Sequence, residues 1–176
     1  MARFVAFLRA VNVGRRRMEM AALREALEGD GISDVTTYIA SGNAIVTSSL
    51  RPGDLEQEIE RRIEAEFGFL AEAFVRTTAQ VSTIVGRSPF GEVPAGHTHL
   101  VAFLRSAPSA AERRAIEALS GPVDSLEVHG AEVHWHIAGR SMDTELKPRD
   151  WKAVGAGLNT TRNITMLTKL AAKLQD

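Results

Sequence analysis

The sequence contains no cysteine. This absence excludes disulfide bonds, thiolate nucleophiles and cysteine-ligated zinc or iron–sulfur sites, and it is typical of proteins in a reducing cytosol. No apolar run approaches the ~20 residues that a transmembrane helix needs, and the N-terminus shows no signal-peptide pattern. We therefore expect a cytoplasmic protein that does not bind membranes.

The sequence also lacks an excess of charge of either sign. It has 21 basic and 22 acidic residues, which gives a formal net charge of -1. Such a balance provides no overall attraction to nucleic acid, so RNA or DNA binding would need a local basic patch. A chain of 176 residues with 44% hydrophobic residues is long enough and apolar enough to bury a core. We expect a globular protein, and its charge does not favour nucleic acid as the partner.

Recognisable catalytic and nucleotide-binding motifs are missing as well. The chain contains neither G-x-x-x-x-G-K-[ST] nor G-x-G-x-x-G, and it has no G-x-S-x-G nucleophile elbow. General acid–base residues can come from positions far apart in a sequence, so these absences do not decide whether the protein is an enzyme. The sequence predicts no cofactor.

One apolar strand occurs twice in the chain. The pattern Val5-Ala6-Phe7-Leu8-Arg9 returns as Val101-Ala102-Phe103-Leu104-Arg105. Both alternating sets of side chains are apolar, which is typical of a central strand covered on both faces. The repetition predicts two copies of one supersecondary unit.

The first copy reads as strand, helix, strand, strand, helix, strand. The expected elements are strands at 3–11, 35–39, 44–47 and 70–75, and helices at 18–28, 52–67 and 78–86. This order is the split βαβ, or ferredoxin-like, arrangement. We predict a first half at 1–87 and a connector at 88–96, which is dense in glycine and proline.

The second copy, residues 97–176, starts in the same way and then departs from the pattern. We expect a strand at 98–105, a helix at 109–119, a hairpin of 123–129 and 131–138, and a last helix at 163–174. No fourth strand is evident between the hairpin and that helix. The predicted fold is α+β, with two tandem ferredoxin-like halves from an internal duplication and a degenerate second half.

One group of polar residues is predicted to share a sheet edge. In a split βαβ unit the first two strands are parallel, so the loop after strand one lies beside the hairpin turn after strand two. That loop leads to a helix N-terminus, which favours an anion, and arginine provides forked donors for phosphate or carboxylate. We predict a site for a small anionic ligand, a nucleotide or phosphorylated metabolite, formed by Arg9, Asn12, Gly14, Arg15, Ser41, Gly42 and Asn43. The structural alternative is an ordinary loop and turn with a solvated arginine edge.

The five histidines lie close together in the sequence, between residues 97 and 136. His134 and His136 project from one face of a strand, and pairing of strands would bring His99 near them, as in a zinc or nickel site. However, the histidines alternate with Val133, Trp135 and Ile137, which is typical of a strand with one solvated face. We favour this second interpretation and assign no metal ligand.

The segment before the last helix has two interpretations. Asn163 or Thr161 caps the helix, or Arg162 at the helix N-terminus makes a second contact with an anion. Arg162 and Asn163 are therefore included among the candidate ligand-binding residues.

Three motifs together resemble the DUF1697 family, a group of bacterial proteins of unknown function. They are Leu8-Arg9-Ala10-Val11-Asn12-Val13-Gly14, Thr37-Tyr38-Ile39-Ala40-Ser41-Gly42-Asn43-Ala44, and Thr161-Arg162-Asn163. The resemblance covers nearly the whole chain and implies a two-part α+β fold with an internal duplication. It also implies that Arg9, Asn12, Gly14, Ser41, Gly42, Asn43, Arg162 and Asn163 match the family's motif positions. Two departures are Ala10, where the family usually has glycine, and the arginines at 15–17, which replace a glycine- and lysine-rich run.

Two other functions compete with ligand binding. The protein could have a structural or assembly role as a homodimer formed on an open sheet face. It could also bind RNA, because ferredoxin-like sheets do so in one RNA-binding class, although the aromatic signature of that class is missing here.

Overall fold

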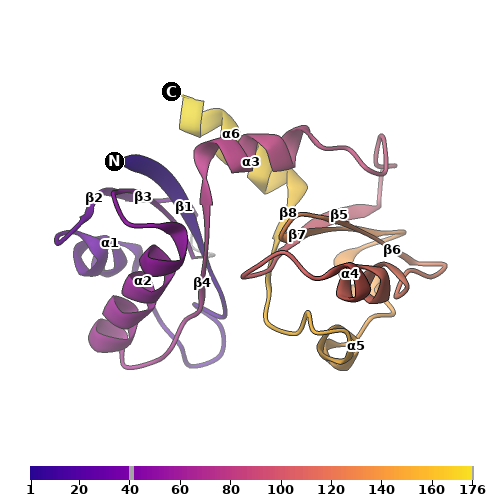
Figure 1. Cartoon of the computed structure of the whole chain (residues 1–176), viewed down its shortest axis with the longest axis horizontal. Helices are drawn as coiled ribbons and strands as arrows, with labels where there is room; N and C mark the ends of the chain where they lie inside the picture. The colour runs from indigo at the N-terminus through magenta and orange to yellow at the C-terminus, as the bar shows by residue number, and fades with distance from the viewer. Residues whose placement is uncertain (40–41, 176) are drawn as a thin grey trace. The chain divides into compact units, whose positions relative to one another are not determined.

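The computed structural model describes residues 1–39 and 42–175. The chain divides into two compact units, Met1–Ser82 and Thr83–Asp176 (Figure 1). Each unit contains one four-stranded antiparallel sheet with helices. Among the described residues, no helix combines the length and apolar character needed to cross a membrane.

The first unit has the predicted order of elements. They are β1 (Ala2–Leu8), α1 (Met20–Leu27), β2 (Ile32–Thr37), β3 (Asn43–Ser48), α2 (Pro52–Phe67) and β4 (Ala73–Thr77). The strands lie in the order β2-β3-β1-β4, and all neighbours are antiparallel. The prediction that β1 is a buried central strand is therefore confirmed. A further helix, α3 (Thr78–Gly86), continues across the boundary between the units.

The second unit repeats this strand order and contains a strand that the sequence did not reveal. Its elements are β5 (Thr98–Phe103), α4 (Ala110–Glu117), β6 (Asp124–His129), β7 (Glu132–Ile137), η1 (Ser141–Asp143), α5 (Pro148–Ala153), β8 (Thr160–Asn163) and α6 (Ile164–Gln175). The sheet order is β6-β7-β5-β8. The predicted strand–helix–strand–strand order of this half lacked a fourth strand, and the structure supplies it as β8. The sequence pattern did not mark it, because β8 is a polar edge strand of four residues with no apolar alternation.

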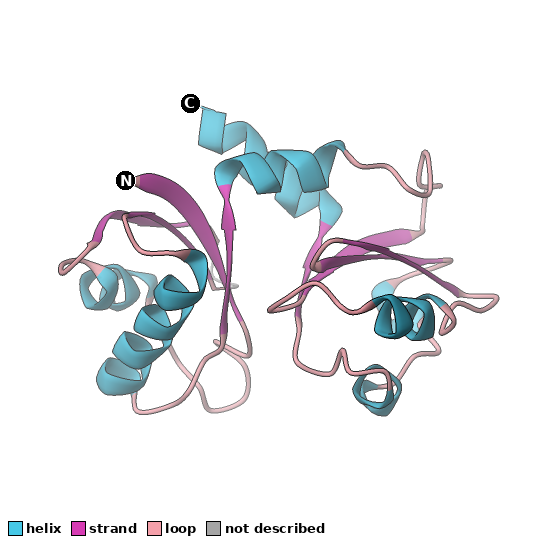
Figure 2. Ribbon diagram, viewed as in Figure 1, coloured by secondary structure: helices cyan, strands magenta, loops and turns pink. Residues whose placement is uncertain are grey.

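Side chains of two helices form the core of the first unit with one face of its sheet. Figure 2 shows α1 and α2 side by side on that face. Helix α2 starts with Pro52 in its first turn and ends at Gly68, whose φ of 73° is left-handed. The fully buried residues of this core include Ala6, Leu23, Leu27, Leu55, Ile59 and Ile63.

The core of the second unit is built around two tryptophans. The rings of Trp135 on β7 and Trp151 on α5 lie 5.1 Å apart between centroids. The Asp124 carboxylate is 2% exposed and accepts hydrogen bonds from Trp135 Nε1 at 2.7 Å and from Glu145 N at 2.9 Å. Asp124 thus fixes the segment between β7 and α5 against the sheet.

Carboxylates of the helices contact one edge strand of each sheet, β4 and β6. On the edge strand β4, Ala73 N and Val75 N donate to Glu60 Oε1 and Glu56 Oε1 of α2 at 2.8 and 2.9 Å. On β6, Val128 N donates to Glu117 Oε1 at 3.0 Å. An edge strand with unpaired N–H groups is a template for aggregation, and these side chains occupy such groups.

The edge contact at Glu56 gives a first prediction. Glu56→Ala should lower the free energy of unfolding by about 1–3 kcal/mol, because the buried Val75 N–H loses its acceptor. Glu56→Gln, which keeps an acceptor oxygen, should cost less. Denaturant unfolding measures both, with the exposed Glu64→Ala on the same helix as the control. An equal loss in Glu56→Ala and Glu64→Ala would contradict this role.

Candidate functional site

The loop after β1 is closed by one side chain, Asn12. Its Nδ2 donates to Met18 O at 3.1 Å, and its Oδ1 accepts from Met18 N at 2.8 Å. Within the loop, Arg16 N donates to Val13 O at 3.1 Å. Asn12 and Gly14 both have left-handed φ, 53° and 58°. The amide of Asn12 therefore shapes residues 13–17 into a compact loop at the end of the strand.

The hairpin turn between β2 and β3 lies against this loop, at the shared edge that the topology predicted. Leu8 N donates to Gly42 O at 2.8 Å, and a Cβ at Gly42 would collide with the side chain of Val11. Asn43 is fully buried, and its Nδ2 donates to Tyr38 O at 2.9 Å across the turn. Ser41 lies outside the described residues.

The four arginines of the loop differ in what they contact. Arg9 pairs with Glu72 at 3.3 Å. Arg16 Nη1 donates to Leu70 O at 3.3 Å, and its guanidinium lies 5.4 Å from the centre of the Phe69 ring. The side chains of Arg15 and Arg17 are exposed and have no hydrogen-bond or ion-pair partner in the described part of the chain. Two cationic groups at this edge are thus available to an anion.

Backbone strain is concentrated next to the loop and the turn. Ala10 has a φ of 56° and Ile39 a φ of 51°. The left-handed region costs an L-residue with a Cβ roughly 1–2 kcal/mol, and glycine reaches it without that cost. Glycine at position 10 would adopt this conformation without that cost.

This strain leads to a second prediction. Ala10→Gly should raise the free energy of unfolding by about 0.5–1 kcal/mol, because relief of about 1–2 kcal/mol exceeds the entropic cost of glycine. Denaturant unfolding measures the change. Ala107, in the loop after β5, does not have a positive φ, so Ala107→Gly should be neutral or destabilising. A loss of stability in Ala10→Gly would show that position 10 is not strained.

Arg162 and Asn163 belong to the second unit. Asn163 Oδ1 accepts from Thr165 N at 2.8 Å at the start of α6, which confirms the predicted helix cap. Arg162 is 9% exposed, and burial lowers its pKa to about 10. Its Nη1 donates to Thr160 Oγ1 and to Thr161 O, both at 2.8 Å. A ligand role for these two residues stays a prediction.

The histidines form two contacting pairs on one face of the second sheet. His99 lies opposite His136 in the β5–β7 register, so the expected proximity of these strands is confirmed. His97 Nδ1 lies 3.0 Å from His136 Nε2, and His99 Nε2 lies 2.9 Å from His134 Nδ1. The expectation of a solvated face was wrong at His134, which is 0% exposed, and its partner His99 is also buried, at 6%. Strand alternation cannot show whether a polar face is covered.

Burial favours the neutral forms of His134 and His99. The pKa of His134 is lowered to about 4, mainly by burial and then by the neighbouring His99, His129 and Arg87. The pKa of His99 is also lowered, mainly by burial. The Nε2 atom of His134 is buried and has no hydrogen-bond partner among the described residues. A proton on His134 would therefore be costly.

The third prediction concerns acid stability. An unfolded histidine titrates near 6.5, whereas His134 titrates near 4 in the fold, so the unfolded state binds more protons between these values. The contribution of neutral His134 to the free energy of unfolding is complete above pH 6.5 and is lost towards pH 4. The loss is up to about 3 kcal/mol, because each tenfold difference in proton affinity between the folded and unfolded states corresponds to about 1.4 kcal/mol. Fluorescence of the two tryptophans, both in this unit, follows the unfolding.

His134→Gln removes the titrating group and should flatten the pH dependence between 4 and 6.5. His97→Gln, at an exposed position, is the control and should change it less. An identical pH profile in wild type and His134→Gln would rule out His134 as the source.

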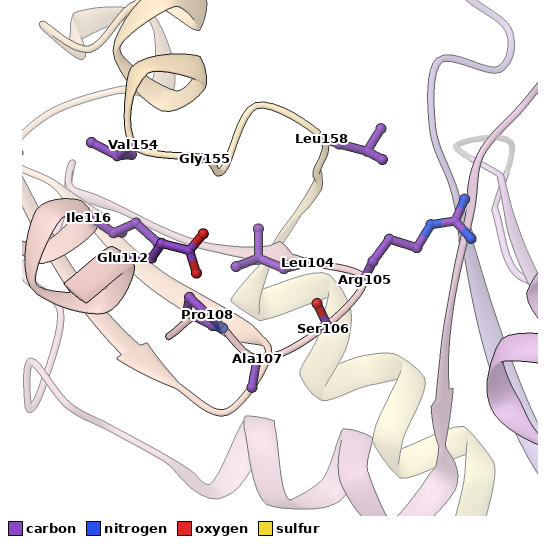
Figure 3. A pocket seen from close by; sticks show the side chains of 10 residues that line it. All are labelled: Leu104, Arg105, Ser106, Ala107, Pro108, Glu112, Ile116, Val154, Gly155 and Leu158. Carbon is purple, nitrogen blue, oxygen red and sulfur yellow. The ribbon is translucent and has the colours of Figure 1, made fainter. Parts of the chain in front are cut away.

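The second unit also has a small pocket beside the end of β5, of about 230 Å³ (Figure 3). It is lined by Leu104, Arg105, Ser106, Ala107, Pro108, Glu112, Ile116, Val154, Gly155 and Leu158. The Glu112 carboxylate points between the apolar side chains, and the Arg105 guanidinium points away from it (Figure 3). Glu112 Oε2 accepts from Ser109 N at 2.8 Å, which starts α4. Sequence reasoning missed this pocket, because Glu112 has the pattern of an ordinary helix start.

Comparison with known proteins identifies the family. The model described as "Protein of unknown function (DUF1697)" matches residues 1–134. The chain belongs to the DUF1697 family. A search of curated proteins gave no match. Among solved structures, the chain is similar to the conserved bacterial protein SP0830 from Streptococcus pneumoniae, with a TM-score of 0.77 and 20% identity over 100% of this chain and 99% of that one. At this identity the likeness shows the fold alone.

Proposed function

We propose that this DUF1697 protein binds a small anionic ligand, a nucleotide or phosphorylated metabolite, at the loop 9–17 and the turn 38–43. The observation that carries the proposal is the loop closed by Asn12, which presents Arg15 and Arg17 without internal partners. Guanidinium groups bind phosphate with paired donors.

The predicted residues of the first unit that the structure describes have supporting parts in this proposal. The side-chain amides of Asn12 and Asn43 hold the loop and the turn, respectively. Gly42 has no Cβ, which leaves room for the side chain of Val11. Gly14 carries no side chain at the tip, so a ligand can approach the backbone. Arg9 is 40% exposed at its side chain and already paired with Glu72, so it contributes charge to the rim rather than a first contact.

We also propose that each unit is ferredoxin-like and that the two arose by duplication. Both sheets have the same strand order, and Val5 pairs with Arg76 as Val101 pairs with Arg162. Both arginines are buried, and each Nη1 donates to the carbonyl of the preceding residue at 2.8 Å. Leu8 N and Leu104 N each donate to the hairpin turn of their own sheet, at 2.8 Å.

A protein partner, including a second copy of this chain, is the second candidate. Val13 and Ile39 are exposed by 53% and 52%, and they lie in the loop and the turn of the proposed site. Apolar side chains beside arginines are typical of protein interfaces. A self-association that Val13→Ser or Ile39→Ser abolishes, measured by sedimentation, would favour this candidate over small-ligand binding.

The fourth prediction tests the ligand site by a thermal-shift screen with inorganic phosphate, nucleotides and sugar phosphates. Ligand at a hundred times its Kd stabilises the native state by about 2.7 kcal/mol. The variant Arg15→Ala/Arg17→Ala should weaken binding about tenfold or more, because charge-assisted hydrogen bonds contribute about 1.5–3 kcal/mol each.

The matched control is Arg51→Ala/Arg61→Ala, which removes the same charge from exposed positions of the same unit. Equal affinities in both double variants would show that only net charge matters and would refute the loop as the site. Absence of any shift with the wild-type protein would also refute it.

A further inference from the structure

We propose that His97 and His136 form a two-imidazole site for a divalent transition-metal ion of the copper or nickel type. The proposal concerns the second unit alone and does not depend on ligand binding at the arginine loop. It rests on the distance between the two ring nitrogens, on how the backbone holds the rings, and on their access to solvent.

The distance between the two nitrogens suits one geometry. His97 Nδ1 and His136 Nε2 are 3.0 Å apart. Two ligands about 2.0–2.1 Å from a metal are about 2.9 Å apart when they meet at a right angle, and about 3.3 Å apart in a tetrahedron. Right-angled nitrogen ligands are typical of square-planar and tetragonal Cu²⁺ and Ni²⁺ sites. The pair thus has nearly the spacing that such an ion requires. The ion would take the place of the hydrogen bond between the rings, and the ring that now donates would carry its proton on its other nitrogen.

The backbone holds both rings before any ion arrives. His97 ends a turn in which its N donates to Pro94 O at 3.1 Å, with Gly96 at a left-handed φ of 81°. The next residue, Thr98, is fixed to the end of β7 by its Oγ1, which donates to Gly139 O at 2.8 Å. His136 lies on β7, which pairs with strands on both sides. Such preorganisation lowers the entropic cost of binding.

Access to solvent distinguishes the His97–His136 pair from the other histidine pair. The second pair, His99 and His134, has a similar distance of 2.9 Å, but both residues are buried, so a hydrated ion cannot enter. His97 is exposed and His136 is half-buried. The Phe90 ring lies 5.6 Å from His136 and covers it from one side. An ion can therefore reach the first pair from solvent.

The two imidazoles alone do not complete the coordination of such an ion. An imidazole must be deprotonated to bind a metal, so affinity should fall in acid. No group of three or more His, Asp or Glu side chains is placed to hold a metal in the described residues. The ion would thus keep coordination positions for water or for an external ligand.

The experiment is a titration of the untagged, full-length protein with Cu²⁺, followed by electron paramagnetic resonance, and with Ni²⁺, followed by thermal shift. The wild-type protein should bind one Cu²⁺ with two nitrogen ligands. His97→Gln and His136→Gln should each weaken this binding at least tenfold. His129→Gln, on β6, is the control and should leave it unchanged. Tryptophan fluorescence shows whether each variant is folded.

Three results would overturn the proposal. They are wild-type binding no tighter than that of folded His97→Gln, loss of binding in His129→Gln, or a spectrum without nitrogen ligands.

Discussion

The structure depends on two apolar strands, β1 and β5, that are hydrogen-bonded on both sides and buried on both faces. Val5, Ala6 and Phe7 are fully buried, as are Val101, Ala102 and Phe103. A strand of this kind fixes its neighbours, because a slip by one residue would move every side chain to the wrong face. The loop after β1, the turn after β2 and the arginines of β4 and β8 all take their positions from these strands.

The sequence was informative where apolar periodicity is strong. It predicted β1, β5, α2 and both hairpins, since Leu55, Ile59 and Ile63 recur at helical spacing and the strands alternate or are apolar throughout. It failed at β8, where Thr160 and Arg162 are the buried residues. Side chains that are buried by pairing at a sheet edge leave no apolar pattern, so only the register with β5 reveals this strand.

For the candidate site, the sequence predicted correctly that the loop after β1 lies beside the turn after β2. It did not predict what the side chains of this loop and turn contact. Asn12 and Asn43 were expected to meet a ligand, yet their amides are hydrogen-bonded to the loop and the turn. The reason is physical: an asparagine at a tight turn finds backbone partners within a few residues, and no pattern separates that use from ligand binding. Arg15 and Arg17 have no such partners nearby, so their charge stays available.

The two units carry different polar groups on sheets of the same strand order. In the first, the loop after the central strand is closed by Asn12 and carries arginines. In the second, the loop at the corresponding end of β5 borders a small pocket with the Glu112 carboxylate. The strand order and the register of the buried arginines are the same in both. Because the two sheets are alike and their loops differ in charge, the function of this protein is to be sought in the loops, and the shared geometry of the sheets explains only how the loops are held.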